Sequence, residues 1–140
     1  MVSVEYAKKD LYERIVAAKL YIEANYAGKI DISDISGKAF FSKFHFIRLF
    51  KKIYGKTPHE YLTAVRIRNA RLLLRNNHAV SDVCFRVGFE SISSFSGLFK
   101  KTVGISPSTF VAKEQLRKSQ VKEEPLKHIS GCFAHRLGWI

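Results

Sequence analysis

The chain has 140 residues, of which 24 are basic and 12 acidic, so its net charge at pH 7 is +12. A hydrophobic fraction of 46% is enough for a compact core, and no apolar run approaches the roughly 18 residues that a membrane span needs. The amino terminus has no signal-peptide pattern, and two cysteines, Cys84 and Cys132, are too few for a disulfide framework. We therefore expect a cytoplasmic protein.

The positive charge is concentrated in the middle of the chain. Residues 38–104 carry thirteen basic and three acidic side chains (13 − 3 = +10), against 5 − 6 = −1 for residues 1–37 and 6 − 3 = +3 for residues 105–140. A charge of this size attracts phosphate polyanions or acidic membranes. The middle segment is therefore the expected binding surface.

The first predicted element is an amphipathic helix from about residue 10 to residue 26. Its apolar residues Leu11, Ile15, Ala18 and Ile22 recur every three or four positions, which places them on one helical face. We expect this face to pack against the element that follows.

An internal repeat organises the rest of the chain. FKKIYGKTPHEY begins at residue 50 and FKKTVGISPSTF begins at residue 99, so the two copies are offset by 99 − 50 = 49 residues. Upstream, ISDI at 32–35 matches VSDV at 80–83 with an offset of 80 − 32 = 48, which assigns one extra residue, Glu90, to the second copy. Such a repeat indicates two copies of one structural unit.

Each copy reads as a short helix, a tight turn and a longer helix with a basic outer face, which is the helix-turn-helix arrangement. Ser42 and Ser91 are expected to cap the longer helices at their start, and Gly55 and Gly104 to close them. Apolar spacing predicts one buried face on each longer helix, made of Phe46, Leu49, Phe50 and Ile53 in the first copy and Phe95, Leu98, Phe99 and Thr102 in the second.

A linking helix is predicted between the copies, over residues 58–75. A hydroxyl residue followed by proline favours the start of a helix. Thr57-Pro58 is therefore expected to begin the linking helix, and Ser106-Pro107 to begin a last helix. At about 1.5 Å per residue the linking helix would be about 27 Å long, close to the roughly 34 Å between successive major-groove faces of DNA. The apolar positions expected on its packed side are Tyr61, Leu62, Val65, Leu72 and Leu73.

The carboxyl-terminal part is less informative. Residues 113–124 are expected to extend or fray the last helix, and the final segment is amphipathic enough to dock on the body or on a partner. We divide the chain into a first helix-turn-helix subdomain with its amino-terminal helix (1–56), the linking helix (57–76), a second subdomain (77–114) and a tail (115–140).

Two stretches, SKFHFIRLFKKIYGKTPHEYL and SDVCFRVGFESISSFSGLFKKTVGISPSTF, closely resemble the AraC/XylS family of bacterial transcription regulators. The resemblance covers roughly residues 10–112. It implies an all-α fold of seven helices, monomeric contact with two adjacent major grooves of duplex DNA, and activation or repression through RNA polymerase. Many relatives carry a separate ligand-binding or dimerisation domain, and 140 residues leave no room for one. This chain is therefore expected to be either a short stand-alone regulator or an excised DNA-binding domain.

The DNA-reading candidates lie opposite the buried faces. Family base-contacting positions, carried over residue by residue, fall on Phe44, Ile47 and Arg48 in the first copy and on Ile92, Ser93 and Ser96 in the second. Arg48 is the strongest candidate, because a guanidinium can bind guanine O6 and N7 together. Phosphate contacts, which position a protein without reading sequence, are expected from Ser42, Lys43, Lys51, Lys52, Ser91, Lys100 and Lys101.

The second copy departs from the family at Gly97, where a long polar or basic residue is usual. Its longer helix therefore has little with which to read bases. We expect sequence specificity to come mainly from the first copy, with the second adding backbone contact.

Other chemistry is disfavoured by the sequence. His128, Cys132 and His135 have spacing that a helix could bring to one face, but Gly131 interrupts them and a fourth zinc ligand is not evident, so we expect no metal or cofactor. No catalytic triad, paired acids or phosphate-binding loop is present, which argues against an enzyme. A non-specific architectural DNA binder and a protein-interaction module with an acidic partner remain as alternatives to sequence-specific regulation.

Overall fold

The computed structural model describes residues 4–31 and 43–123, and the described part of the chain is entirely helical outside its turns. The all-α class is therefore confirmed. Six helices are described against the seven expected, and the short helix predicted around Ile32 and Ile35 lies outside the described residues. The helices are α1 (Val4–Asn25), α3 (Lys43–Tyr54), α4 (Pro58–Arg75), α5 (Val80–Arg86), α6 (Ile92–Val103) and α7 (Pro107–Glu123).

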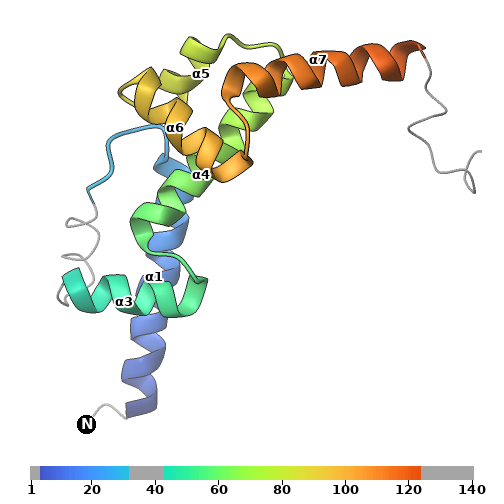
Figure 1. Ribbon diagram of the computed structural model, residues 1–140. Coiled ribbons are helices and arrows are strands. Elements are labelled where there is room, and N and C mark those ends of the chain that lie inside the picture. Colours follow the sequence, from blue (N-terminus) through green and yellow to red (C-terminus); the bar gives the residue numbers. More distant parts are fainter. Residues whose placement is uncertain (1–3, 32–42, 124–140) are drawn as a thin grey trace, which may run out of the picture.

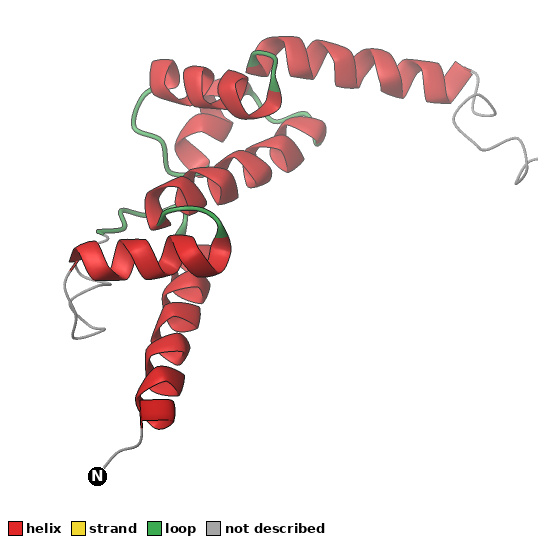
Figure 2. Ribbon diagram, turned by 60° about the horizontal axis from the view of Figure 1, so that its bottom comes forward, coloured by secondary structure: helices red, strands yellow, loops and turns green. Residues whose placement is uncertain are grey.

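Helix α4 runs through the middle of the molecule and contacts every other described helix (Figure 1). α1 and α3 pack together at one end of it, and α5 and α6 pack together at the other. Figure 2, from a second direction, again shows α3 lying across α1 and α7 extending away from the body as an arm. No helix among the described residues is long and apolar enough to cross a membrane.

Two hydrophobic cores divide the molecule into two units. We call α1, α3 and the start of α4 the first unit, and the rest of α4 with α5, α6 and α7 the second unit. α4 contributes Leu62 to the first core and Ile67, Ala70 and Leu74 to the second. The other buried residues are Ile15, Ala18, Ile22, Phe46 and Phe50 in the first core, and Val83, Cys84, Val87, Phe89, Phe95, Phe99 and Phe110 in the second.

The sequence repeat is also a repeat in space. The rings of Phe50 and Tyr61 have centroids 5.7 Å apart, and their counterparts 49 residues on, Phe99 and Phe110, have centroids 5.5 Å apart. The four phenylalanines predicted on the buried faces of the longer helices, Phe46, Phe50, Phe95 and Phe99, are fully buried. Each longer helix is thus fixed to its unit by the same two aromatic positions.

The predicted closing glycines and the serine cap of α6 are confirmed. Gly55 has φ +76° and Gly104 has φ +95°, and their amides donate to the carbonyl oxygens of Lys51 and Lys100 at 2.7 and 2.8 Å. A left-handed residue at this place ends a helix because it turns the chain while satisfying a free carbonyl. Ser91 caps α6, its hydroxyl accepting from the amide of Ser94 at 3.2 Å, whereas the equivalent Ser42 lies outside the described residues.

Four expectations about burial or length were wrong. Thr102, expected on the buried face of the second longer helix, is exposed in the last turn of α6. Leu72 is 51% exposed because it lies about 200° around α4 from the stripe of Ala70 and Leu74 that enters the second core. Ile53 is on the same stripe as Phe50 but in the last turn of α3, and it is 39% exposed. The first helix begins at Val4, earlier than the apolar spacing indicated.

Candidate nucleic-acid interface

The outward face of α3 carries an aromatic and a cationic side chain in contact with solvent. Phe44 is 76% exposed, although phenylalanine is a residue that folding normally buries. Arg48 follows one helical turn later and is also exposed. At about 100° per residue the two lie within 40° of each other around the helix axis, and on the side away from buried Phe46. α3 therefore presents a protruding edge suited to a groove.

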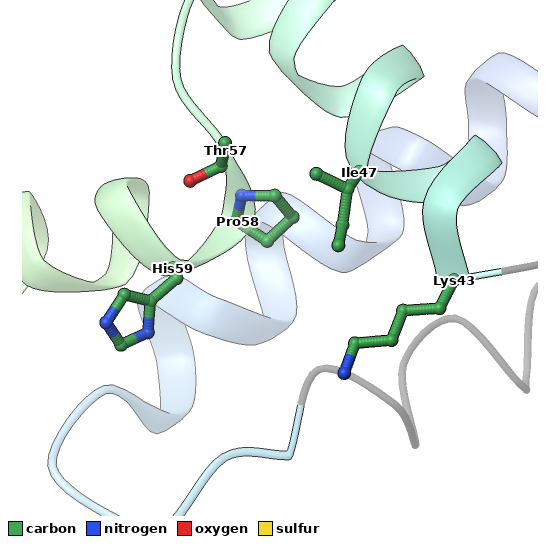
Figure 3. A pocket seen from close by; sticks show the side chains of 5 residues that line it. All are labelled: Lys43, Ile47, Thr57, Pro58 and His59. Carbon is green, nitrogen blue, oxygen red and sulfur yellow. The ribbon is translucent and has the colours of Figure 1, made fainter.

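Ile47 is only half-buried and faces a different environment from the one expected. With Lys43 it lines an open hollow of about 360 Å³ against Thr57, Pro58 and His59 at the start of α4 (Figure 3). Its side chain is directed toward Pro58 in the close-up. The outward stripe of α3 is thus narrower than predicted, and Phe44 and Arg48 form its most accessible part.

The outward face of α6 is built from small side chains. Ile92 is 45% exposed, Ser93 and Gly97 are exposed, and Ser96 is half-buried. Apart from its own helix, no atom lies within 4 Å of where a Cβ of Gly97 would stand, so packing does not require a glycine there. This face offers hydroxyl groups and backbone, with no long polar side chain before Lys100.

The electrostatics of both faces favour an anion. Neither α3 nor α6 contains an acidic residue, and each ends in a pair of lysines. The predicted phosphate contacts Lys43, Lys51, Lys52, Lys100 and Lys101 are all exposed. Ser91 is exposed as well, but its hydroxyl oxygen already accepts from the amide of Ser94.

α3 is held in place by polar contacts between α1 and α4 as well as by the first core. The Tyr61 hydroxyl of α4 donates to the Glu23 carboxylate of α1, and Lys19 lies 3.4 Å from the same carboxylate. Burial and the hydrogen bond to Glu23 raise the pKa of Tyr61 to about 12, so this phenol stays protonated near neutral pH. A hydrogen bond between side chains therefore links α1 and α4, the two helices on which α3 packs.

Sequence reasoning missed Arg66 on α4. Its guanidinium donates to the carbonyl oxygens of Tyr26 at 2.7 Å and Gly28 at 3.0 Å, which tie the segment after α1 to α4. The sequence shows a cation between two apolar residues, Val65 and Ile67, in the middle of a predicted helix, but it does not show which groups that cation contacts.

The candidates set aside earlier have different outcomes. Cys84 is buried in the second core, and burial raises the pKa of its thiol, which disfavours the reactive thiolate. Within residues 4–31 and 43–123 no cluster of histidine, cysteine, aspartate or glutamate could hold a metal ion. His128, Cys132 and His135 lie outside the described residues.

The helix pair α5 and α6, together with an equivalent exposed, acid-free helix α3 at the other end of α4 and the sequence repeat, is typical of a tandem helix-turn-helix DNA-binding domain. Comparison with known proteins agrees, since residues 35–113, more than half of the chain, match a helix-turn-helix domain family. The chain is 36% identical over 91 residues to the probable transcriptional regulator LumQ of Photobacterium leiognathi, covering 64% of this chain and 37% of LumQ. It is 35% identical over 92 residues to the transcriptional activator AarP of Providencia stuartii, covering 65% of this chain and 68% of AarP.

Solved structures show the same similarity. The DNA-binding domain of AdpA, determined in complex with a target DNA, matches with a TM-score of 0.65 and 27% identity, over 79% of this chain and 96% of that one. The chain belongs to the AraC family of DNA-binding transcription regulators. It spans less than half the length of LumQ.

Proposed function

We propose that this protein binds duplex DNA as a monomer and reads two adjacent major-groove segments, one with α3 and one with α6. The observation that carries the proposal is the placement of two exposed, acid-free helices at the two ends of α4. The 18 residues of α4 span about 27 Å, which suits two recognition helices on one side of a duplex. By the repeat, the complete plan is one of seven helices.

In the first unit we assign base contacts to Phe44, Ile47 and Arg48. Arg48 has the donors to bind a guanine edge in two places, worth about 1–3 kcal/mol of discrimination against other bases. Phe44 offers apolar contact to a thymine methyl group, and its 76% exposure supports that role. Ile47, half-buried beside Pro58, contributes the smallest reading surface of the three.

In the second unit the base contacts are assigned to Ile92, Ser93 and Ser96. Serine hydroxyls can donate to or accept from several bases, so they discriminate weakly. Specificity therefore comes mainly from the first unit, while the second adds affinity. The phosphate contacts are assigned to Ser42, Lys43, Lys51, Lys52, Ser91, Lys100 and Lys101.

Selection of bound duplexes from a random library tests this function. Wild type, Arg48→Ala and the matched Lys52→Ala would be compared at one fixed salt concentration close to physiological, because affinity for DNA depends steeply on salt. We expect a wild-type motif in two parts about one helical turn apart. Arg48→Ala should relax the preference in one part only, whereas Lys52→Ala should weaken binding to all sequences alike.

Three outcomes would contradict the proposal or part of it. No enriched motif would indicate the architectural binder, which holds DNA through charge alone. If other polyanions displaced the bound DNA as effectively as duplex DNA does, the protein would be an interaction module for an acidic partner. Equally strict preferences in both parts of the motif would overturn the assignment of specificity to the first unit.

The partner and the cellular context follow from the same proposal. AarP is described as a transcriptional activator, and we extend this role to the present chain, with RNA polymerase as its partner in the cytoplasm. The relatives named above are regulators, which supports a non-enzymatic role.

A further inference from the structure

Arg66 connects three parts of the chain that are far apart in sequence. It lies on α4, and its hydrogen bonds reach the carbonyl oxygens of Tyr26 and Gly28, which directly follow α1 in the first unit. The same guanidinium lies 5.6 Å from the centre of the Phe89 ring, in the turn between α5 and α6 of the second unit. One side chain therefore contacts both units outside their cores.

Backbone packing brings the two units close together at the same place. Gly88, in the turn of the second unit, has φ +101°, a conformation that favours glycine. A Cβ at this position would stand 2.7 Å from the Tyr26 carbonyl oxygen and 2.9 Å from Nε of Arg66. The turn of the second unit thus packs directly on the segment that Arg66 binds.

A second polar contact across the junction, between Lys29 and Glu90, is weak by comparison. Lys29 and Glu90 are 3.9 Å apart, and their side chains are 94% and 83% exposed, so solvent screens most of their attraction. Tyr26 packs against both cores, which adds a non-directional contact. Arg66 therefore makes the strongest directional contact described at this junction.

The Arg66 side chain is held by the protein groups that replace the hydration of its guanidinium. Loss of solvent lowers the pKa of its guanidinium, and the nearby charge of Glu90 opposes that change. A half-buried cation is tolerated because charge-assisted hydrogen bonds and the face of an aromatic ring replace hydration. Substitution would leave the Tyr26 and Gly28 carbonyls without this donor.

From this junction we propose that Arg66 is a positioning residue that holds the two helix-turn-helix units in one relative orientation and thereby sets the half-site spacing the protein accepts, without touching DNA. The inference rests on the proposed two-groove reading. A single helix such as α4 can bend, whereas a second attachment beside it restricts the bending. A narrower range of orientations raises the effective concentration of the second unit at its half-site once the first is bound.

The first experiment measures the orientation in the free protein. Spin labels on cysteines introduced at Lys52 of α3 and Thr102 of α6, both exposed, report the distribution of distances between the recognition helices. The background carries Cys132→Ser and keeps the buried Cys84. We expect a narrow distribution with Arg66 present and a broader one in Arg66→Gln.

Arg68→Gln is the matched control. It removes the same charge from the same helix, but Arg68 is exposed. Its distance distribution should stay as narrow as that of the parent. Arg66→Lys keeps the charge and loses the two-pronged donor, so it should broaden the distribution less than Arg66→Gln, and it serves in place of that variant if Arg66→Gln does not fold.

The second experiment measures binding by unlabelled proteins to the selected two-part duplex, to single half-sites and to duplexes with one or two base pairs inserted between the halves. Arg66→Gln should bind the two-part site about tenfold more weakly, bind a half-site within about twofold of wild type, and tolerate insertions better than wild type. Arg68→Gln should keep the wild-type dependence on spacing.

The outcomes separate this inference from the proposed function. An unchanged distance distribution in Arg66→Gln and Arg66→Lys overturns the positioning role, whatever the DNA results are. Equal losses on half-sites and two-part sites overturn it as well, because they indicate general damage to binding. A broader distribution in Arg66→Gln, together with a wild type that selects only a one-part motif, supports the positioning role and contradicts two-groove reading.

Discussion

The two units have matching interiors and different exteriors. Phe50 and Phe99 pack on Tyr61 and Phe110 at centroid distances of 5.7 and 5.5 Å, although 49 residues separate the copies. On the outward faces the same offset pairs Phe44 with Ser93 and Arg48 with Gly97. The inward residues fix how each recognition helix sits, and the outward residues decide what it can contact. The two copies therefore keep the same scaffold and differ in what their outward faces can recognise.

The shared anchors provide the largest expected effect. Phe50→Ala and Phe99→Ala each remove a fully buried ring and should lower the free energy of unfolding by about 3–5 kcal/mol, because a cavity remains in a packed core. Urea denaturation followed by circular dichroism measures both. If the interiors are equivalent, the two losses should agree within about 1 kcal/mol.

Phe85→Ala is the matched control for these substitutions. Phe85 is 55% exposed on α5, so the same change should cost less than about 1 kcal/mol. A small loss for either Phe50→Ala or Phe99→Ala would mean that its unit does not depend on the aromatic anchor, and the equivalence of the interiors would fail.

Gly97 offers a smaller effect of the opposite sign. It lies in the interior of α6 with space for a Cβ, so Gly97→Ala should raise the free energy of unfolding by about 1 kcal/mol. Thermal unfolding of wild type and variant measures it. Gly104→Ala, at φ +95°, is the contrasting variant and should destabilise, because alanine is strained in the left-handed region. Destabilisation by Gly97→Ala would show that α6 needs a glycine for a reason that packing does not reveal.

The smallest effect concerns the helix starts that follow the two recognition helices. α4 begins with a capping box made by Thr57 and Glu60, whereas the equivalent start of α7 has Thr109 in place of the glutamate. The Glu60 carboxylate accepts from the Thr57 amide at 3.2 Å, and this hydrogen bond lowers the pKa of Glu60. Because the folded pKa is below the unfolded one, the stabilisation is present above the unfolded value and is lost as pH falls through the folded value. The stability advantage of wild type over Glu60→Gln should therefore shrink as pH is lowered from about 7 to about 3.

Thr109, 49 residues after Glu60, provides the control for that titration. Ser106 caps α7 by accepting from the Thr109 amide at 3.2 Å, and neither side chain titrates in this range. The difference between wild type and Thr109→Ala should not vary with pH. An advantage of wild type over Glu60→Gln that is constant with pH would mean that the carboxylate does not contribute to the cap.

Local features of the chain were predictable from the sequence. The caps at Ser91, Thr57 and Ser106 and the closing glycines Gly55 and Gly104 depend on residues within one or two helical turns. The phenylalanine anchors were predictable as well, because the repeat shows the same spacing twice.

Features that depend on the neighbouring element were not predictable in the same way. Leu72 was expected to be buried and is exposed, whereas Ile47 was expected to face outward and is half-buried beside the start of α4. In both cases the position of the neighbouring helices decides how exposed the side chain is. The contact of Arg66 with Tyr26 spans forty residues of sequence, and no local pattern encodes it. The roles of Phe44, Arg48 and Ser93 at DNA stay predictions, because they concern a partner and not the fold.

The sharing of α4 between the cores bears on how such proteins can recombine. Leu62 belongs to the first core and Ile67 to the second, so a crossover between these two residues would exchange one complete recognition surface and divide neither core. Arg66 could stay with the second unit, since its hydrogen-bond partners in the first are backbone carbonyls that any sequence supplies. A chimera joined here would keep the backbone acceptors of Arg66 whichever first unit it receives, and Tyr26, which packs against both cores, is the side chain that the incoming unit has to match. New combinations of half-sites would then arise in a single exchange.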